Sequence, residues 1–517
     1  MSIHLNKLNN KNKKKRMRIH IFPSVCAILM YFLLTDPSQG LDQTQWGVDF
    51  SRNMISTEKG LPVHFDLETE ENILWSAALG GGSYGSPIVA QGCVFIGTNN
   101  IETYDPRREG DLSILLCLNE KDGSLRWQLA VPHIGGDDFL DWPGVGICSE
   151  PTVEGERVYV LTNRGEVVCL DIHGLENGND GPYKDEGRHA TPENQPEIPA
   201  LPPDADILWL FDMRKEIDLY PHDAPHTSIL IDGDVLYLNT GNGVDNTHKK
   251  IGNPKAPSLI ALNKWTGQLL ATEKENIGPN IFHCSWAPPS LGIVSGEKMV
   301  FFGGPDGLCY AFSPVTQENT TPGAALKSLW HFDCDPSAPK EDIHSYVGNR
   351  REGPSAIMGM PVYYQNRVYV VATGDIWWGK RQSWLKCIHA TGKGDITASG
   401  EHWSFEMEAQ SCATPAILND LVFVTDDRGG VHCVDAETGE AHWEHQLGRS
   451  IWGSCLGAEG RIYVGARNGS FAILAADKTK EELFSTRFPD QIHGTPTAAN
   501  GVLYVPTLSR LYAIKNL

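Results

Sequence analysis

Residues 433–443 read CVDAETGEAHW, and segments of the same form occur at 116–127 (LCLNEKDGSLRW) and 260–271 (IALNKWTGQLLA). Each combines a strand-like stretch, a turn that contains glycine, and a large apolar residue shortly after the turn. Glycine supplies the positive φ that such a turn needs, and a large ring packed between units buries much apolar area. The form therefore predicts a repeated β unit in which turn and ring dock one unit onto the next.

Eight such units can be counted. Their first strands begin after small or proline-containing segments near Pro87, Pro151, Ser228, Pro288, Pro361, Pro415, Cys455 and Pro496. Their last strands lie around Trp75, Trp127, Trp209, Leu270, Trp330, Trp403, Trp443 and Phe484. The strand around Trp75 precedes any complete unit, whereas the final unit, 494–517, contains only three strands.

An N-terminal strand that completes the C-terminal unit closes a ring without leaving an open edge. The final repeats are spaced about forty residues apart, which is the length of one four-stranded propeller blade. We therefore predict an all-β fold: one eight-bladed β-propeller of four-stranded blades over residues 72–517, its ring closed by the N-terminal strand.

The first forty residues differ from the rest of the chain. A basic stretch at 11–18 precedes an apolar run at 21–34, and small residues occupy the −3 and −1 positions of a cut before Leu41. These features predict a signal peptide over 1–40, with an uncleaved membrane anchor as the alternative. We expect an exported protein, periplasmic or secreted, in which 41–71 forms an N-terminal linker.

The net charge of the chain indicates which kinds of molecule it can bind. The chain carries a formal charge of −21, and without residues 1–40 it keeps 36 basic and 63 acidic residues, a charge of −27. A negative field of this size disfavours nucleic acid and anionic membrane surfaces. Such a field suits cations, neutral glycans or basic protein surfaces as partners. The alternative is that the charge only keeps an exported protein soluble.

The Ala-x-Asp-x-x-Thr-Gly-x-x-x-Trp form of 433–443 resembles the repeat of propellers of the pyrroloquinoline-quinone (PQQ) type. The resemblance extends from about residue 72 to the end of the chain and implies the propeller fold. The family includes quinoprotein dehydrogenases as well as non-enzymatic scaffolds, one of which resembles the outer-membrane β-barrel assembly factor. The repeat form itself needs no cofactor, and we expect this chain to resemble the non-enzymatic branch.

Dehydrogenases of this family typically bind Ca²⁺ through Glu and Asn, use an Asp base, and often carry two adjacent cysteines. Asn242, in NTGNG (239–243), matches the Asn-bearing segment. No Asp occurs between Thr272 and Pro305, Glu166 follows rather than precedes its Arg-Gly pair, and no two cysteines are adjacent. Because Ca²⁺ needs several oxygen ligands together, we expect no cofactor and no metal. PQQ with calcium, held at Asn242, is the alternative.

Candidate ligand-binding residues come from the expected channel. Residues just before the first strands of the units should line it, where aromatic, thiol and imidazole groups can bind a small ligand or a soft metal. A plug of packed side chains is the alternative. Two further loops, 135–146 and 375–384, carry tryptophans suited to stacking on a sugar or to peptide recognition. The candidates are Tyr84, Trp142, His226, Trp377, Trp378, Trp452 and His493, with Cys148, Cys284, Met358 and Cys412 nearby.

Eleven cysteines follow residue 40, and five share one strand position: Cys117, Cys169, Cys309, Cys387 and Cys433. We interpret these five as small apolar residues inside blades, with one or two disulfides elsewhere left open. No hydrolase motif occurs in the sequence. The functional prediction is a monomeric binding or scaffold module for a protein, peptide or glycan partner. The alternative is an oxidoreductase resembling a PQQ-dependent alcohol dehydrogenase.

Overall fold

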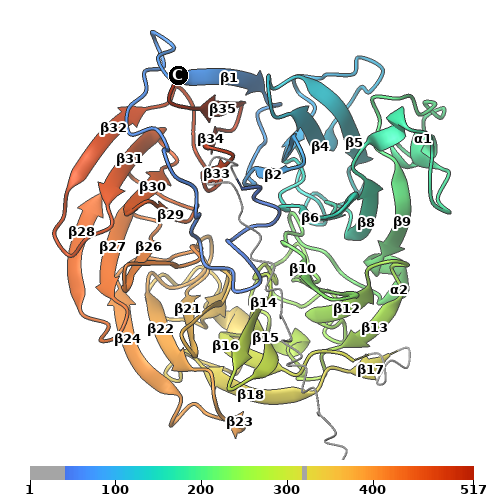
Figure 1. The fold of residues 1–517 in the computed structure, drawn as a ribbon. Coiled ribbons are helices and arrows are strands. Elements are labelled where there is room, and N and C mark those ends of the chain that lie inside the picture. Colours follow the sequence, from blue (N-terminus) through green and yellow to red (C-terminus); the bar gives the residue numbers. More distant parts are fainter. Residues whose placement is uncertain (1–40, 317–322) are drawn as a thin grey trace, which may run out of the picture. The chain divides into compact units, whose positions relative to one another are not determined.

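A computed structural model describes residues 41–316 and 323–517, so the predicted signal peptide lies outside the described residues. Within these ranges the strands form eight sheets arranged as blades around a central axis (Figure 1). The predicted eight-bladed β-propeller is confirmed. In the part of the chain described, no helix is both long and apolar enough to span a membrane.

The blades follow one another along the chain, and within each blade the strands run from the centre of the ring outward (Figure 1). Blade 1 contains β2 (Ile88–Ala90), β3 (Cys93–Asn99), β4 (Leu112–Asn119) and β5 (Leu125–Pro132). Blade 2 contains β6 (Thr152–Glu154), β7 (Arg157–Leu161), β8 (Glu166–Asp171) and β9 (Ile207–Asp212). Blade 3 contains β10 (Leu230–Asp232), β11 (Val235–Asn239), β12 (Leu259–Asn263) and β13 (Leu269–Thr272). Blade 4 contains β14 (Ser290–Val294), β15 (Glu297–Gly303), β16 (Leu308–Phe312) and β18 (Ser328–Asp333).

The second half of the ring is built in the same way. Blade 5 contains β19 (Ala356–Ile357), β20 (Val362–Tyr364), β21 (Arg367–Thr373), β22 (Ser383–His389) and β24 (Glu401–Met407). Blade 6 contains β25 (Ala416–Leu418), β26 (Leu421–Thr425), β27 (Gly430–Asp435) and β28 (Ala441–Gln446). Blade 7 contains β29 (Leu456–Ala458), β30 (Arg461–Gly465), β31 (Ser470–Ala475) and β32 (Glu482–Arg487). Blade 8 contains β33 (Thr497–Ala499), β34 (Val502–Pro506), β35 (Arg510–Ile514) and β1 (Ile73–Ala78).

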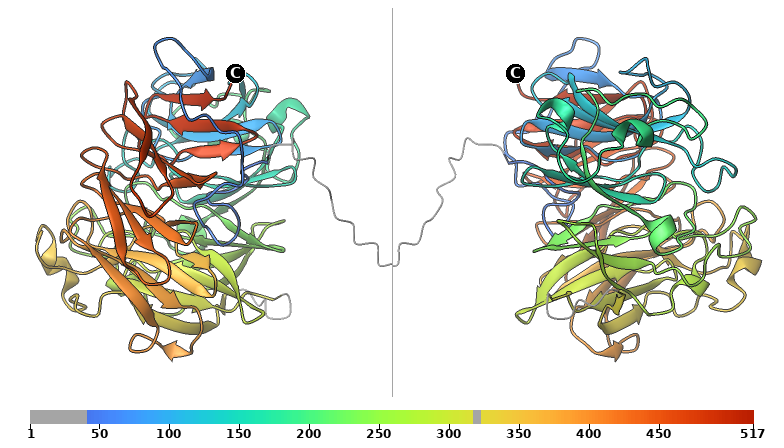
Figure 2. Two further views of the ribbon diagram at one scale, coloured as in Figure 1. Left: turned by 60° about the vertical axis from the view of Figure 1, so that its left-hand side comes forward. Right: turned by 90° about the vertical axis from the view of Figure 1, so that its right-hand side faces the viewer.

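The N-terminal strand closes the ring as predicted. β1 pairs antiparallel with β35, with Trp75 opposite Ala513 and Ala78 opposite Arg510. Figure 2 shows the blue β1 beside the red C-terminal strands from both sides. Because β1 fills the outer position of blade 8, the ends of the chain hold each other and the ring has no open seam.

Small additions modify the four-stranded plan. The two-residue strands β17 (Ala324–Ala325) and β23 (Gly394–Asp395) pair in parallel with the outer strands of blades 3 and 4. Both β19 and β20 pair with β21. The described helices are short and lie in connecting segments: η1 (Gly174–Glu176), α1 (Glu186–His189), α2 (Met213–Glu216), η2 (Gly278–Asn280) and η4 (Ile343–Tyr346).

The turn and tryptophan of the repeat join adjacent blades. Trp403, in the last strand of blade 5, donates its indole N–H to the carbonyl of Ala436, in the turn of blade 6, at 3.0 Å. Gly439 in that turn has φ 74°, and a Cβ on it would lie 2.7 Å from the Trp403 ring. Trp75 and Gly123 repeat this contact between blades 8 and 1. The segment 433–443 is thus part of the architecture of the fold.

The cysteines behave as packing residues. All eleven described cysteines are free thiols, and the five at the shared strand position are fully buried. Cys433 lies opposite Trp443, and Cys117 lies opposite Trp127, each on the strand beside the docking tryptophan. A small side chain at this position leaves room for the ring to pack, as we predicted.

Residues 41–71, predicted only as a linker, run across the centre of the ring (Figure 1). Gln43 bridges Val89 in blade 1, and the backbone of this segment bonds to blades 2, 4, 5 and 7 through Val153, Leu291, Tyr363 and Gly457. The side chain of Asn53 bonds to Ile417 in blade 6. The buried Arg52 donates to the carbonyls of Ser228 and Pro289, and Ser56 donates to Ala498 in blade 8. The segment therefore contacts the inner side of all eight blades.

Candidate functional site

A cavity of about 410 Å³ lies on the axis of the ring. Most of its wall comes from residues directly before the innermost strands of the blades, as the topology of a propeller dictates. Trp46, from the N-terminal segment, also lines it. All seven predicted ligand-binding residues line this one cavity: Tyr84, Trp142, His226, Trp377, Trp378, Trp452 and His493. We call it the axial pocket.

Three tryptophans form an exposed rim. Trp142, Trp377 and Trp378 are 43, 44 and 38% exposed although they line the pocket. The ring of Trp377 lies 5.4 Å from that of Trp286 and 5.6 Å from that of Trp452, both in edge-on or tilted geometry. The rim therefore offers indole faces that are anchored on one side and open on the other, which is the arrangement that aromatic recognition surfaces require.

The two rim tryptophans at 377 and 378 are held by one buried carboxylate. Oδ1 of Asp375 accepts hydrogen bonds from the backbone N–H groups of Trp377 and Trp378, at 3.0 and 2.7 Å. Arg350 fixes the same turn from outside by donating to the carbonyl of Trp377. These bonds lower the freedom of the turn, so the rings are positioned before any ligand arrives.

The adjoining part of the pocket wall is aromatic, and a cation packs against one of its rings. The imidazole of His493 packs edge-on against Tyr84 at 4.9 Å and against Trp452 at 5.1 Å. The guanidinium of Arg467 lies 3.8 Å from the centre of the Trp452 ring. Burial, with Arg467 nearby, lowers the pKa of His493 to about 3, so this imidazole is neutral at physiological pH. Elsewhere in the wall, His226 contacts Glu150 at 2.9 Å.

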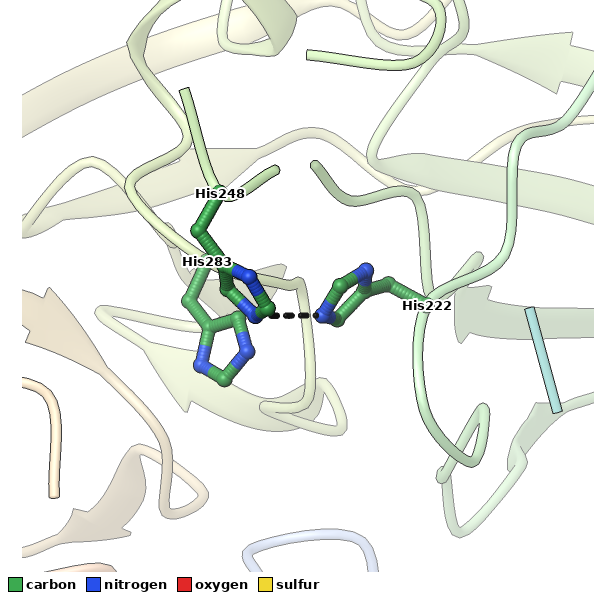
Figure 3. Close-up of side chains that lie close together, drawn as sticks. All are labelled: His222, His248 and His283. Carbon is green, nitrogen blue, oxygen red and sulfur yellow. Dashed lines mark hydrogen bonds between the residues drawn. The ribbon is translucent and has the colours of Figure 1, made fainter. Parts of the chain in front are cut away.

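Three further histidines, none of them predicted as ligand-binding, meet at the wall beside the rim (Figure 3). His222 precedes blade 3, His248 lies in the insertion after β11, and His283 precedes blade 4. A ring nitrogen from each lies within 4.8 Å of the other two, and all three side chains are buried. Nε2 of His222 is 3.2 Å from Nε2 of His248, the contact drawn as a dashed line in Figure 3. We call these residues the histidine cluster.

The backbone brings the cluster together through a local set of bridges. Pro221 pairs with Asn242, and Gly243 pairs with Cys284, so the segments that carry His222 and His283 lie on either side of one strand-like segment. That segment turns back on itself through a Val244–Ile251 bridge, and His248 lies in the turn. The insertion in blade 3 thus reaches over the pocket wall and delivers the third imidazole.

Asn242, the residue matched to the dehydrogenases, supports this arrangement from behind. Its Oδ1 accepts from the backbone N–H of Tyr220 at 3.3 Å, and its Nδ2 donates to the carbonyl of Asn253 at 2.9 Å. The residue is fully buried and is absent from the pocket lining. Both polar atoms of its side chain therefore bind the protein backbone.

Burial and neighbouring charges set the protonation of the cluster. Burial, together with the two other imidazoles, lowers the pKa of His222 to about 2, and burial with His283 lowers the pKa of His248. Burial acts the same way on His283, but the Asp375 carboxylate at 2.8 Å outweighs it and raises the pKa. Burial raises the pKa of Asp223, which lies between His222 and His283, to about 6. His222 and His248 are thus neutral at physiological pH.

The sequence contained only a weak signal for the cluster. His222 and His283 occupy segments just before innermost strands, the rule that identified His226 and His493. His248 lies in an insertion whose path no repeat predicts. The three are separated by 26 and 35 residues, far from the short spacings of local metal motifs. Only the fold brings them together.

Comparison with known proteins agrees with the repeat. Over residues 40–172 and 392–479 the chain matches the family model described as outer membrane protein assembly factor BamB. It is 28% identical over 96 residues to BamB of Burkholderia pseudomallei, covering 18% of this chain and 24% of that protein. It is 27% identical over 126 residues to a polyvinylalcohol dehydrogenase of a Pseudomonas species, covering 22% of this chain and 20% of that protein. The matches thus span only about a quarter or less of these relatives.

Among solved structures, BamB from Moraxella catarrhalis superposes with a TM-score of 0.50 and 14% identity, covering 85% of this chain and 98% of that one. This similarity concerns the fold alone. Fold and repeat together define a β-propeller of the PQQ-like repeat class. The chain is similar to this class over the matched residues, and the proteins to which it is similar include both an assembly factor and a dehydrogenase.

Proposed function

We propose that this protein is an exported, monomeric binding module whose axial pocket takes a neutral sugar unit of a glycan. The observation that carries the proposal is the convergence of six tryptophans on one cavity of about 410 Å³, at positions 46, 142, 286, 377, 378 and 452. Flat indole faces suit the apolar face of a sugar ring, and a few polar groups in such a pocket fix its orientation.

The polar groups of the pocket favour a neutral ligand with hydroxyl donors. The carboxylates of Glu150 and Asp223 line the cavity and provide hydrogen-bond acceptors. The chain as a whole carries a net charge of −21, which repels anionic ligands such as acidic peptides or nucleic acid. A sugar hydroxyl satisfies a buried acceptor without bringing a second negative charge into the pocket.

The test is titration of the purified protein with a panel of neutral mono- and oligosaccharides, followed by tryptophan fluorescence and calorimetry. We expect saturable binding that Trp377→Ala weakens and Trp265→Ala leaves unchanged. Trp265 is a matched control because it is 49% exposed but lies outside the pocket lining. Equal binding in both variants, or no binding by any neutral sugar, would overturn the glycan proposal, and capture of a protein partner would then identify a scaffold.

Export belongs to the same proposal. A basic stretch and an apolar run precede Leu41 in the sequence. The backbone N–H of Leu41 donates to the carboxylate of the buried Glu58, and the carbonyl of Leu41 accepts from Asn500. A chain cut before Leu41 would place its new ammonium group beside that carboxylate, where it is stabilised by charge.

The donor set around Asn242 does not fit a calcium-bound quinone. Calcium takes six to eight oxygen ligands, whereas both polar atoms of Asn242 are engaged by the backbone. The nitrogen-rich cluster beside it offers the wrong ligand type for this ion. Titration with PQQ and Ca²⁺, read by absorbance and dye-linked alcohol oxidation, should therefore give no saturable binding. Binding with turnover would favour the dehydrogenase alternative instead.

A further inference from the structure

We propose that His222, His248 and His283, with the Asp223 carboxylate beside them, bind a divalent transition-metal ion such as Zn²⁺ in the wall of the axial pocket. This departs from the expectation of no metal that the sequence supported. The site stands independently of the glycan proposal, because its donors come from the protein alone and its test requires no sugar.

Hydrogen bonds to the far side of two imidazoles direct their free nitrogens to a common point. Nδ1 of His222 lies 2.7 Å from the carbonyl oxygen of Val244, and Nδ1 of His283 lies 2.8 Å from Oδ2 of Asp375. Because a carbonyl and a carboxylate only accept, each Nδ1 carries the proton, which leaves the Nε2 lone pair of the neutral ring facing the cluster. This pairing of a ligand histidine with an oxygen acceptor is typical of metal sites.

One nitrogen atom of the cluster has no hydrogen-bond partner. Nε2 of His283 is buried and makes no hydrogen bond within the described residues, although the residue is only 4% exposed. A buried polar atom left unsatisfied costs about 1–3 kcal/mol, so such atoms are uncommon without a reason. A metal ion at the centre of the cluster accounts for it, because the lone pair of Nε2 then has a ligand bond.

The ring nitrogens of the three histidines lie within 4.8 Å of one another, and one of their separations is that of two ligands on a single ion. Oδ1 of Asp223 lies 3.5 Å from Nε2 of His222, and Oδ2 of Asp223 lies 3.6 Å from Nε2 of His283. Ligand atoms about 2.1 Å from a tetrahedral zinc ion are about 3.4 Å apart. The His222–His248 separation of 3.2 Å also agrees with this spacing. The two contacts of Asp223 are long for hydrogen bonds, and they place its carboxylate next to the proposed ion.

The donor types select the ion. Three imidazoles suit zinc, copper, iron or nickel, whereas calcium and magnesium prefer oxygen ligands throughout. The carboxylates of Asp223 and, behind His283, Asp375 offset the charge of a cation held among buried groups. Aromatic rings surround the cluster, with Phe139 on His222 and Trp378 on His248, which keeps the ligands in place and limits access to the pocket side.

The pocket side of the cluster leaves a place for a further ligand. His248, His283 and Asp223 line the axial pocket, so an ion among them contacts its contents. An oxygen or nitrogen donor on a molecule in the pocket would complete the coordination sphere, as water or substrate does in metal sites with an open position. The metal thereby links recognition by the aromatic rim to a polar anchor at the wall.

The experiment uses the full exported chain, stripped with a chelator and titrated with Zn²⁺ by calorimetry and with Co²⁺ by visible absorption. We expect one equivalent of either ion and a thermal shift on binding. His248→Gln and His283→Gln should each abolish stoichiometric binding, and Asp375→Asn, which removes only the acceptor behind His283, should weaken it by about 10–100-fold.

His389→Gln/His402→Gln is the control for binding to paired histidines in general. The rings of His389 and His402 lie 5.0 Å apart in blade 5, and neither lines the axial pocket. Their replacement should leave the stoichiometry at one. Absence of stoichiometric binding by the wild type, or unchanged binding by folded His248→Gln, would overturn the proposal. His248 lies in a turn, and circular dichroism checks that this variant folds.

Discussion

Nδ1 of His283 and Oδ2 of Asp375 are 2.8 Å apart, a contact that joins the segment before blade 4 to the loop of blade 5. The other oxygen of the same carboxylate holds the turn that carries Trp377 and Trp378. Asp375 is 1% exposed, so a single buried carboxylate fixes both the histidine cluster and part of the aromatic rim. The two halves of the site are structurally coupled through this residue.

Asp375→Asn tests the coupling. The amide can keep the acceptor for the tryptophan turn, but it presents an N–H group to the donor at Nδ1 of His283. We expect the free energy of unfolding to fall by about 1–3 kcal/mol, because a buried hydrogen bond is lost and a donor is left unsatisfied. Chemical denaturation measures the loss, and stability equal to that of the wild type would show that His283 finds another acceptor.

Trp377→Ala separates binding from folding. The side chain is 44% exposed, so its removal should change the melting temperature little. Removing one indole that stacks on a bound sugar should cost about 0.5–1.5 kcal/mol of binding free energy, or about two- to tenfold in affinity. Calorimetry with the best saccharide of the panel and thermal denaturation give the two numbers. A large drop in stability would show that the ring serves mainly to pack the loop.

Gly439→Ala tests the docking of blade 5 onto blade 6. The φ of 74° is unfavourable for alanine, and its Cβ would lie 2.7 Å from the ring of Trp403. Gly460 has φ 71° with no atom closer than 4.0 Å, so Gly460→Ala carries the backbone cost alone. We expect Gly439→Ala to be less stable than Gly460→Ala by about 1–3 kcal/mol, the usual cost of overpacking. Equal losses of stability would assign the whole effect to the backbone.

Glu166→Gln tests a structural ion pair through pH. Burial alone would raise the pKa of Glu166, but the hydrogen bond from His189 at 2.9 Å and the ion pair with Arg164 at 2.7 Å lower it to about 2. The folded state thus favours the carboxylate over the acid. The resulting stability, about 3 kcal/mol, is complete above the ordinary pKa of about 4.5 and is lost as the pH falls toward about 2.

The measurement is the free energy of unfolding of wild type and Glu166→Gln from pH 7 down to pH 2. The variant should be less stable at pH 7, and its stability should fall less steeply below about pH 4.5. Parallel curves for the two proteins would show that the pair does not couple to folding.

Export can be tested at the new terminus. Sequencing of the protein recovered from an exporting host should begin at Leu41, where the backbone N–H contacts Glu58. Glu58→Gln should lower the melting temperature of the processed protein, since the carboxylate also accepts from the backbone N–H of Gly501 at 2.7 Å. Recovery of a chain that retains residues 1–40 would favour the uncleaved anchor.

The fold could be predicted because it is repetitive. Gly439, Trp403 and their equivalents recur from blade to blade and make the same kind of contact. Each repeat of the sequence therefore predicts the same blade independently. The position of Tyr84 or His493 on the axis followed from the same topology. The path of residues 41–71 could not be predicted, because its bonds are made to eight distant blades and follow no period.

The histidine cluster in the wall of the axial pocket was harder to predict from the sequence. His248 reaches the cluster through an insertion in blade 3, and Asp375 reaches it from blade 5, so no short stretch of sequence contains the pattern. Asn242 matched a family segment, yet its side chain binds the backbone behind the cluster. The motif match at Asn242 identified a segment next to the histidine cluster, but it did not predict which side chains line the pocket.

The N-terminal segment that crosses the ring also constrains the order of assembly. Its partners include Ile417, Gly457 and Ala498, which leave the ribosome more than 350 residues after Asn53, Met54 and Ser56, the residues to which they bond. Contacts so distant in sequence form late, because their loop-closure entropy must be offset by structure already present. This early-synthesised segment therefore makes its contacts last, and Trp46 joins the lining of the pocket only when synthesis of the ring is complete.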